Sequence, residues 1–213
     1  CDWQPARLQC QGGAGVDCLR AQEVGVLDHW YRPVTGGEGR IQYPGGVPRG
    51  SEPYWPVWLS GIPGSKDPAL AERFGNDFVR YMAFVPDAGA AFDVRQYDFD
   101  RDPPRLATMS RIYDATDPDL TAFRARGGKL LLFHGWADPL VTPQRTLDYY
   151  AAVRATMGGA GSTARFARLF MLPGVDHCGL QPGPGAKSIE FDPLPALEAW
   201  LERDEAPAAL NVR

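Results

Sequence analysis

The chain has 213 residues, of which 44% are hydrophobic and 23% charged, and its formal net charge is −4. This composition is typical of a globular protein, and the length suits one large domain or two small ones. The mild acidity argues against a nucleic-acid partner, and no apolar run approaches the roughly 20 residues of a membrane-spanning helix. We therefore expect neither nucleic acid nor a membrane as a partner.

The N-terminal part, residues 1–66, is rich in Gly, Pro and aromatic residues and has few long periodic stretches. A helix is predicted over 17–31, with Asp17 as its N-cap, and a second, amphipathic helix over 69–81. Residues 93–105 are dense in Asp, Arg and aromatic residues. We expect this stretch to be an ordered crossing segment, because its aromatic side chains need a surface on which to be buried.

The chain contains four cysteines, at positions 1, 10, 18 and 178. Cys10 and Cys18 flank a Gly-rich loop and are spaced for a small disulfide in an oxidising compartment. A zinc site is the alternative, but the chain has no Cys-x₂-Cys spacing and its histidines are distant in sequence. Cys1 and Cys178 can then pair with each other, or each can pair with a cysteine upstream of this chain. The chain opens at Cys1 rather than Met, so we expect a processed or truncated product.

The C-terminal half has a more regular pattern. We predict a helix over 117–126, a strand over 129–134, a helix over 142–157 with Thr142 as N-cap, a strand over 166–172 and a helix over 192–203. This alternation predicts an α/β fold with a parallel sheet. Because two strands alone cannot form such a sheet, we expect them to be edge strands of a larger sheet supplied from upstream.

Each of these two strands ends in a Gly-containing turn that carries one acid or one histidine. Asp138 follows the first strand in Gly135-Trp-Ala-Asp138, and His177 follows the second in Pro173-Gly-Val-Asp-His177. In α/β-hydrolases the second and third members of a Ser–Asp–His triad appear in this order. His177 would take the proton of a serine, and Asp138 would orient the imidazole ring.

The nucleophile should precede both residues, but no Gly-x-Ser-x-Gly occurs in the 213 residues. The alternative is that Asp138 only begins a turn before Pro139 and that His177 is a surface histidine. His134, at the end of an apolar strand, is expected to be a buried histidine bonded to the backbone, and His29 to be structural. Asp176 is a poor partner for His177, because adjacent side chains of an extended segment point apart.

Several motifs resemble the tannase and feruloyl esterase family. Its C-terminal part is matched by His134-Gly-Trp-Ala-Asp-Pro-Leu-Val-Thr-Pro143, Phe170-Met-Leu-Pro-Gly-Val-Asp-His-Cys-Gly179 and Gly183-Pro-Gly185. Its lid domain, just after the calcium-binding loop, is similar to Cys1-Asp-Trp-Gln-Pro-Ala-Arg-Leu-Gln-Cys10 and Asp17-Cys18-Leu19, and further along to Arg80-Tyr-Met-Ala-Phe84 and Asp98-Phe-Asp-Arg-Asp-Pro103. The resemblance covers nearly the whole chain.

The resemblance implies an α/β-hydrolase fold, with a partial parallel sheet, flanking helices and part of an inserted lid domain. Residues 1–105 would be the remainder of the lid, and residues 106–213 the C-terminal part of the catalytic domain. Members of the family are secreted or periplasmic serine esterases that cleave hydroxycinnamate or gallate esters, and one branch acts on a mono-ester of terephthalate. The resemblance places the catalytic acid on Asp138 and the base on His177.

The resemblance also implies partners outside the chain. Cys178 would pair with a cysteine beside the nucleophilic serine, and Cys1 would pair across the calcium loop with an upstream cysteine. We therefore expect an N-terminal segment of the same precursor, joined by disulfides, to supply the serine and the oxyanion-hole amides. Catalysis would need no cofactor. A structural calcium would bind in the full-length protein at a loop outside this chain, which itself would hold no metal.

The substrate would be a small aromatic ester. Trp55 and Trp58 can stack on a phenolic ring, or they can belong to the core of the lid. Arginines between positions 73 and 111 can bind a substrate carboxylate through two hydrogen bonds. Two rival functions remain, namely another α/β-hydrolase activity, such as that of a peptidase or lactonase, and a non-catalytic binding module that keeps the fold.

Overall fold

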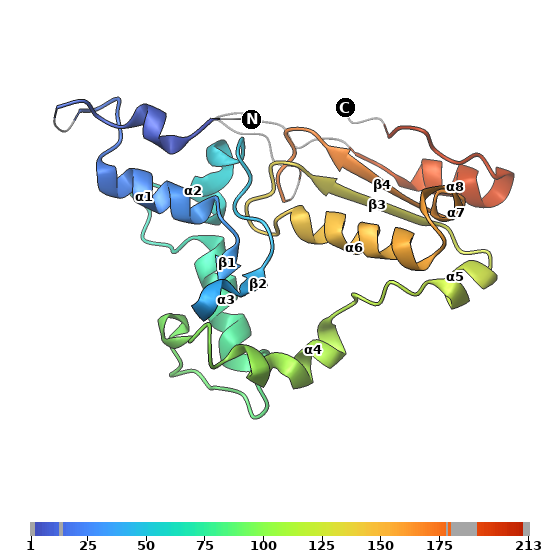
Figure 1. The fold of residues 1–213 in the computed structure, drawn as a ribbon, viewed down its shortest axis with the longest axis horizontal. Helices are drawn as coiled ribbons and strands as arrows, with labels where there is room; N and C mark the ends of the chain where they lie inside the picture. Colours follow the sequence, from blue (N-terminus) through green and yellow to red (C-terminus); the bar gives the residue numbers. More distant parts are fainter. Residues whose placement is uncertain (1–2, 13–14, 178, 180–190, 211–213) are drawn as a thin grey trace.

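The structure is a computed structural model that describes residues 3–12, 15–177, 179 and 191–210 (Figure 1). In chain order, its longer helices and its strands are α1 (Ala21–Trp30), β1 (Val34–Thr35), β2 (Ile41–Tyr43), α2 (Trp55–Trp58), α3 (Leu70–Tyr81), α4 (Ala107–Tyr113), α5 (Thr121–Ala125), β3 (Leu130–Gly135), α6 (Gln144–Thr156), α7 (Ala160–Thr163), β4 (Ala167–Leu172) and α8 (Leu194–Arg203). Short 3₁₀ turns lie at Pro5–Leu8, Gly37–Gly39, Glu52–Tyr54, Val94–Gln96 and Pro103–Leu106.

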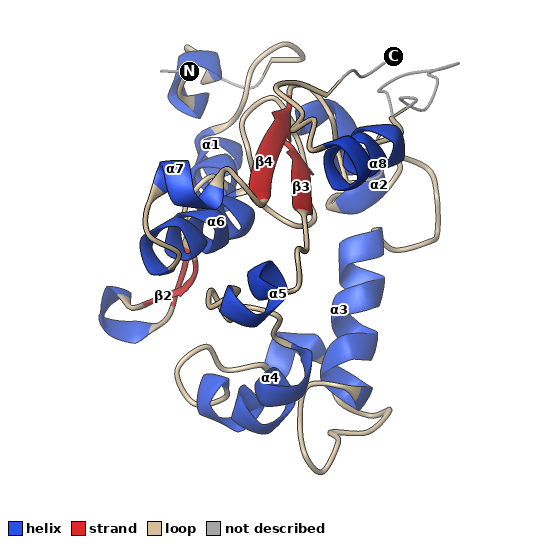
Figure 2. Ribbon diagram, turned by 90° about the vertical axis from the view of Figure 1, so that its right-hand side faces the viewer, coloured by secondary structure: helices blue, strands red, loops and turns tan. Residues whose placement is uncertain are grey.

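Strands β3 and β4 form the sheet that organises the C-terminal half. They pair in parallel, in a register that runs from Leu130 opposite Ala167 to Gly135 opposite Leu172. Helices α6 and α7 lie on one side of the two strands and α8 on the other, as Figure 2 shows. The predicted α/β class and parallel pairing are therefore confirmed.

Side chains are buried on both sides of this sheet. On the α6 side, Val153 and Ala167 are fully buried at 0% exposure, and Phe166 and Met157 complete the cluster. On the α8 side, Trp200 is 1% exposed. The middle of β3 is nevertheless only half-buried, although a strand covered on both faces was predicted. A sheet two strands wide is too narrow for its helices to enclose both strands fully.

The N-terminal part begins with the predicted disulfide, which joins Cys10 to Cys18. Helix α1 starts at Ala21, later than predicted, and its N-cap is Arg20 rather than Asp17. The reason is that Leu19 pairs with the preceding segment, since its amide donates to Leu8 and its carbonyl accepts from Cys10. Because of this extended pairing, the helix begins only at residue 21.

The start of α6 also differs from the prediction, because Pro143 rather than Thr142 occupies the N-cap position. The Thr142 hydroxyl instead lies 3.5 Å from the carbonyl oxygen of Pro44. Its side chain therefore faces the N-terminal part of the chain rather than the amides of its own helix.

The crossing segment at 93–105 is ordered, as predicted. Its Tyr97 packs with Phe92 against a buried cluster that includes Val79 and Phe84. Figure 1 shows α3 and α4 extending away from the sheet, and this segment connects them along the chain. Within the described ranges, the structure contains no helix with the length and apolar character needed to span a membrane.

Candidate active site

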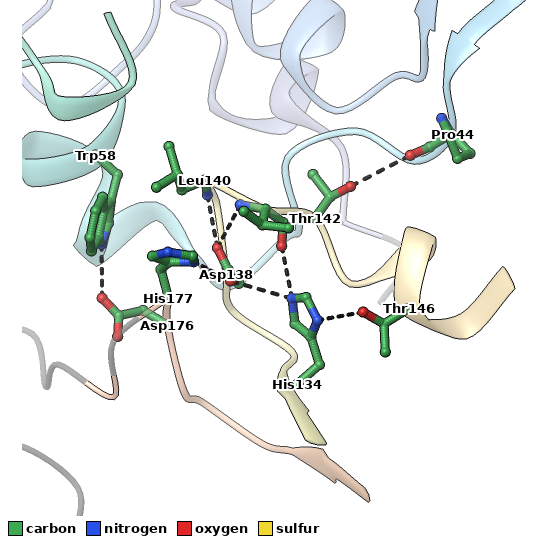
Figure 3. Close-up of polar contacts among 10 residues, drawn as sticks. Pro44, Trp58, His134, Asp138, Leu140, Thr142, Thr146, Asp176 and His177 are labelled. Atoms are coloured by element: carbon green, nitrogen blue, oxygen red, sulfur yellow. Dashed lines mark hydrogen bonds and ion pairs between the residues drawn. The ribbon is translucent and has the colours of Figure 1, made fainter. Parts of the chain in front are cut away.

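The two turns that follow β3 and β4 bring Asp138 and His177 together. Because the strands are parallel neighbours, their carboxyl ends lie at the same edge of the sheet. Nδ1 of His177 lies 2.9 Å from Oδ2 of Asp138, although the residues are 39 positions apart in sequence (Figure 3). The structure therefore places the two residues that were predicted from the sequence, Asp138 and His177, within hydrogen-bonding distance.

Gly135, the last residue of β3, makes this approach possible. A Cβ atom at this position would lie 2.1 Å from the carbonyl oxygen of Val175, inside van der Waals contact. That same oxygen accepts a 3.0 Å hydrogen bond from the amide of Ala137, and the amide of Trp136 donates to Leu172 at 2.9 Å. The two turns therefore contact each other through their backbones.

Asp138 is only 3% exposed, and both of its oxygens have donors. Oδ1 accepts from the amides of Leu140 and Val141 at 2.9 and 2.8 Å. Oδ2 faces His177 and also lies 3.3 Å from Nε2 of His134. Asp138 thus begins a turn, as the simpler interpretation proposed, and also holds a histidine.

Burial by itself would raise the pKa of Asp138, because a carboxylate loses hydration energy in the interior. The hydrogen bonds from His134, from the Val141 amide and from His177 outweigh that effect and hold the pKa below its ordinary value. The carboxylate is therefore ionised at neutral pH.

His134 is bonded to the backbone, as predicted, and is partly buried, with its side chain 11% exposed. Nε2 lies 2.8 Å from the carbonyl oxygen of Val141, and Nδ1 lies 2.8 Å from Oγ1 of Thr146. Hydrogen bonding to Asp138 raises the pKa of His134 against the opposing effect of burial. The contact with Asp138 was not predicted, although the four-residue spacing across a tight turn is a signal for it.

His177 is the accessible member of the pair, with 33% of its side chain exposed. It borders a pocket of about 430 Å³ whose other lining residues include Leu172, Val175, Phe133 and Phe191. The rings of the two phenylalanines are 4.7 Å apart, centre to centre. An imidazole that donates Nδ1–H to a carboxylate has Nε2 available as a general base, so this pair can move a proton at the pocket.

Helix α2 and the 3₁₀ turn before it contact the turn after β4 from the N-terminal part of the chain. The Trp58 ring meets the His177 ring edge to face at 5.2 Å, and its Nε1–H donates to Asp176 at 2.9 Å. The hydroxyl of Tyr54 donates to the carbonyl of Gly174 at 2.6 Å. Asp176 therefore bonds to Trp58, and Asp138 rather than its neighbour Asp176 is the partner of His177 (Figure 3).

The two tryptophans that were expected either to contact substrate or to belong to the core of the lid lie in α2. Trp58 is 4% exposed, whereas Trp55 is partly buried against Trp30 and Tyr31 at ring distances of 5.1 and 5.7 Å. Their contact with substrate stays a prediction. Four of the arginines considered as carboxylate ligands form ion pairs with nearby aspartates, namely Arg80, Arg95, Arg101 and Arg105.

Cys1 and Cys178 lie outside the described residues, so their pairing also stays a prediction. Among the residues that the structure describes, no group of three or more His, Cys, Asp or Glu side chains is placed to hold a metal ion.

Comparison with known proteins assigns the chain that carries this site to a family. The whole chain, residues 1–213, matches the family model described as tannase and feruloyl esterase. It is 34% identical to an uncharacterized esterase of Xanthomonas campestris pv. campestris, covering 97% of this chain and 41% of that protein. It is 33% identical to the mono(2-hydroxyethyl) terephthalate hydrolase of Piscinibacter sakaiensis, covering 96% and 37%. The chain thus spans about two fifths of the length of these relatives.

The fold is shared with solved structures. An esterase from Aspergillus oryzae superimposes with a TM-score of 0.76 at 24% identity, over 97% of this chain and 43% of that one. This similarity confirms the predicted α/β-hydrolase fold.

We expect Gly135→Ala to destabilise the protein by about 1–3 kcal/mol, because the new methyl group must displace the Val175 carbonyl. Gly161→Ala is the matched control, since a Cβ atom at that position meets nothing within 4 Å. Urea unfolding of both variants measures the difference. Equal midpoints for the two variants would show that the turns tolerate a wider separation.

Asp138→Asn should destabilise the protein by about 1–3 kcal/mol at neutral pH, because it removes a charged acceptor. Since the native pKa of Asp138 is lowered, its stabilisation is present above the ordinary pKa near 4 and is lost as the pH falls through the native value. The difference from the wild type in unfolding free energy should therefore narrow below about pH 4. Asp87→Asn, which changes an exposed carboxylate, should stay within about 0.5 kcal/mol of the wild type. A difference for Asp138→Asn that is constant down to low pH contradicts this account.

Proposed function

Because the chain belongs to the tannase and feruloyl esterase family, with a match over residues 1–213, we propose that it supplies the acid and the base of a serine carboxylic ester hydrolase. The observation that carries the proposal is the 2.9 Å hydrogen bond between His177 and the buried Asp138. In this role Asp138 fixes the tautomer of His177 and stabilises the imidazolium that forms during turnover.

The proposed reaction proceeds in two halves. Nε2 of His177 takes the proton of a serine hydroxyl as the oxygen attacks the ester carbonyl, and it then protonates the leaving alcohol. Water later attacks the acyl-enzyme, with His177 again as the base. The acyl-enzyme route needs a serine in reach of His177, and we propose that an N-terminal segment of the same precursor provides it, together with the oxyanion-hole amides.

We propose an ester of an aromatic acid as the substrate. One relative is a hydrolase of a terephthalate mono-ester, and others are described as feruloyl esterases. The pocket beside His177 has Phe133 and Phe191 in its lining, and such rings suit contact with a planar aromatic group. Trp55 and Trp58 of α2 stay candidates for the wall of the acyl pocket.

The remaining parts of the proposal concern the whole protein. Residues 1–105 would belong to the lid and residues 106–213 to the catalytic domain, with disulfides through Cys1 and Cys178 to the N-terminal segment. The Cys10–Cys18 disulfide supports an extracellular or periplasmic location. A structural calcium would bind at a loop outside this chain, so no residue described here is assigned to it.

In the full-length protein, His177→Ala and Asp138→Asn should each lower kcat by about four orders of magnitude with a modest change in KM, because both act on the proton transfer. His29→Ala is the control, since this exposed histidine lies on α1. The assay is initial-rate hydrolysis of hydroxycinnamate, gallate and terephthalate esters. Near-normal turnover by His177→Ala would end the assignment, and faster cleavage of amides than of esters would favour the rival peptidase.

The proposed partner is tested by intact mass of the purified protein, before and after reduction. We expect a larger species that yields, on reduction, a chain of about the 23.4 kDa of these 213 residues, or a single longer chain that contains them. A species of this mass under both conditions, with full esterase activity, would exclude the N-terminal segment as the source of the nucleophile.

A further inference from the structure

Asp138 lies between two imidazole rings. His177 contacts its Oδ2 at 2.9 Å, and Nε2 of His134 lies 3.3 Å from the same oxygen (Figure 3). The side chains of His134 and Asp138 are 11% and 4% exposed, so this second contact is shielded from water. The sequence predicted a structural role for His134, but its position beside the acid suggests a more specific one.

The partners of His134 determine which of its nitrogens carries a hydrogen. A carbonyl oxygen can only accept, so the 2.8 Å contact with Val141 requires a hydrogen on Nε2. The Thr146 hydroxyl, 2.8 Å from Nδ1, can donate to a neutral ring or accept from a protonated one. Nε2–H therefore points toward Val141 and Asp138 in either charge state of the ring.

Three separate elements hold the ring in this position. His134 belongs to β3, Thr146 belongs to α6, and Val141 belongs to the turn that connects them. Val141 is bonded twice, because its carbonyl accepts from His134 and its amide donates to Oδ1 of Asp138. The turn cannot shift without breaking bonds to both side chains.

We propose that His134 is a positioning residue, which fixes Oδ2 of Asp138 so that the carboxylate orients His177. This inference rests on the proposed function. Two amides hold Oδ1, whereas the polar contacts of Oδ2 among the described residues are those with the two histidines. Without His134, the carboxylate could rotate about its Cβ–Cγ bond and move Oδ2 away from the line to Nδ1 of His177. Burial acts to raise the pKa of Asp138, and the hydrogen bond from His134 is the strongest of the effects that lower it.

The test compares two amide replacements of His134 in the full-length protein. In His134→Gln the amide nitrogen can occupy the place of Nε2 and keep a donor toward Val141 and Asp138. In His134→Asn the shorter amide reaches only the place of Nδ1, so it keeps the Thr146 contact and loses that donor. We expect His134→Asn to lower kcat by about 10–100-fold with KM nearly unchanged, and His134→Gln to recover most of the loss.

His29→Asn is the matched control. It makes the same replacement at an exposed histidine of α1, so kcat should stay within about threefold of the wild type, well short of the losses seen when an orienting partner is removed. A role of His134 in packing alone would instead make His134→Asn and His134→Gln lose activity in proportion to their loss of thermal stability.

A spectroscopic readout reports the positioning directly. The Nδ1 proton that His177 shares with Asp138 should give a downfield ¹H NMR resonance that is absent in His177→Ala. We expect this resonance to persist in His134→Gln and His29→Asn and to weaken or shift upfield in His134→Asn. If the Asn variant does not fold, the Gln variant decides, because a tenfold or greater loss of kcat in that folded protein would overturn the inference.

The outcomes separate this inference from the function on which it rests. Full kcat in His134→Asn, with His177→Ala inactive, overturns the role of His134 and leaves the esterase proposal standing. Normal turnover in His177→Ala overturns both.

Discussion

The structure around the candidate site depends on one constraint, a negative charge placed almost out of contact with water. Asp138 is 3% exposed, and a buried carboxylate is costly unless each oxygen has donors. The chain supplies them within a few residues, through two backbone amides of the following turn and the imidazole of His134 on the preceding strand. The remaining donor is His177, which lies in the turn after β4, whereas the other three donors lie on β3 or in the turn after it. The local turn therefore stabilises the acid, and the acid holds the distant histidine.

The second requirement is close approach of two turns that are far apart in sequence. Gly135 allows it, because the Val175 carbonyl occupies the space that a side chain would need. The backbone bond from Ala137 to that same carbonyl then links the turn after β3 to the turn after β4. A hydrogen bond of 2.9 Å between two side chains tolerates little change in the spacing of the backbones that carry them. The contact between Asp138 and His177 therefore depends on the close approach that Gly135 allows.

The N-terminal part of the chain also takes part in the site. Trp58 and Tyr54, from α2 and the 3₁₀ turn before it, bond to Asp176 and Gly174 across separations of 118 and 120 residues. The Trp58 ring rests against His177 on the side of the ring away from His134 (Figure 3). The position of the proposed base therefore depends on packing by a segment that the family resemblance places in the lid. Changes in this segment can therefore alter the position of the His177 ring.

The sequence by itself determined the features that depend on local pattern. Apolar runs ending in turns located β3 and β4 to within a residue, the short spacing of Cys10 and Cys18 identified their disulfide, and the strand ends singled out Asp138 and His177.

Only the tertiary structure decided the features that depend on partners distant in the chain. Leu19 pairs with the N-terminal segment and delays α1, Thr142 faces Pro44 instead of capping α6, and Trp58 bonds to Asp176. The second histidine beside Asp138 is an intermediate case, because the spacing is local but the ring's direction is set by Thr146 of α6. Periodicity and turn chemistry act over a few residues, whereas which side chains face one another is settled when the elements pack.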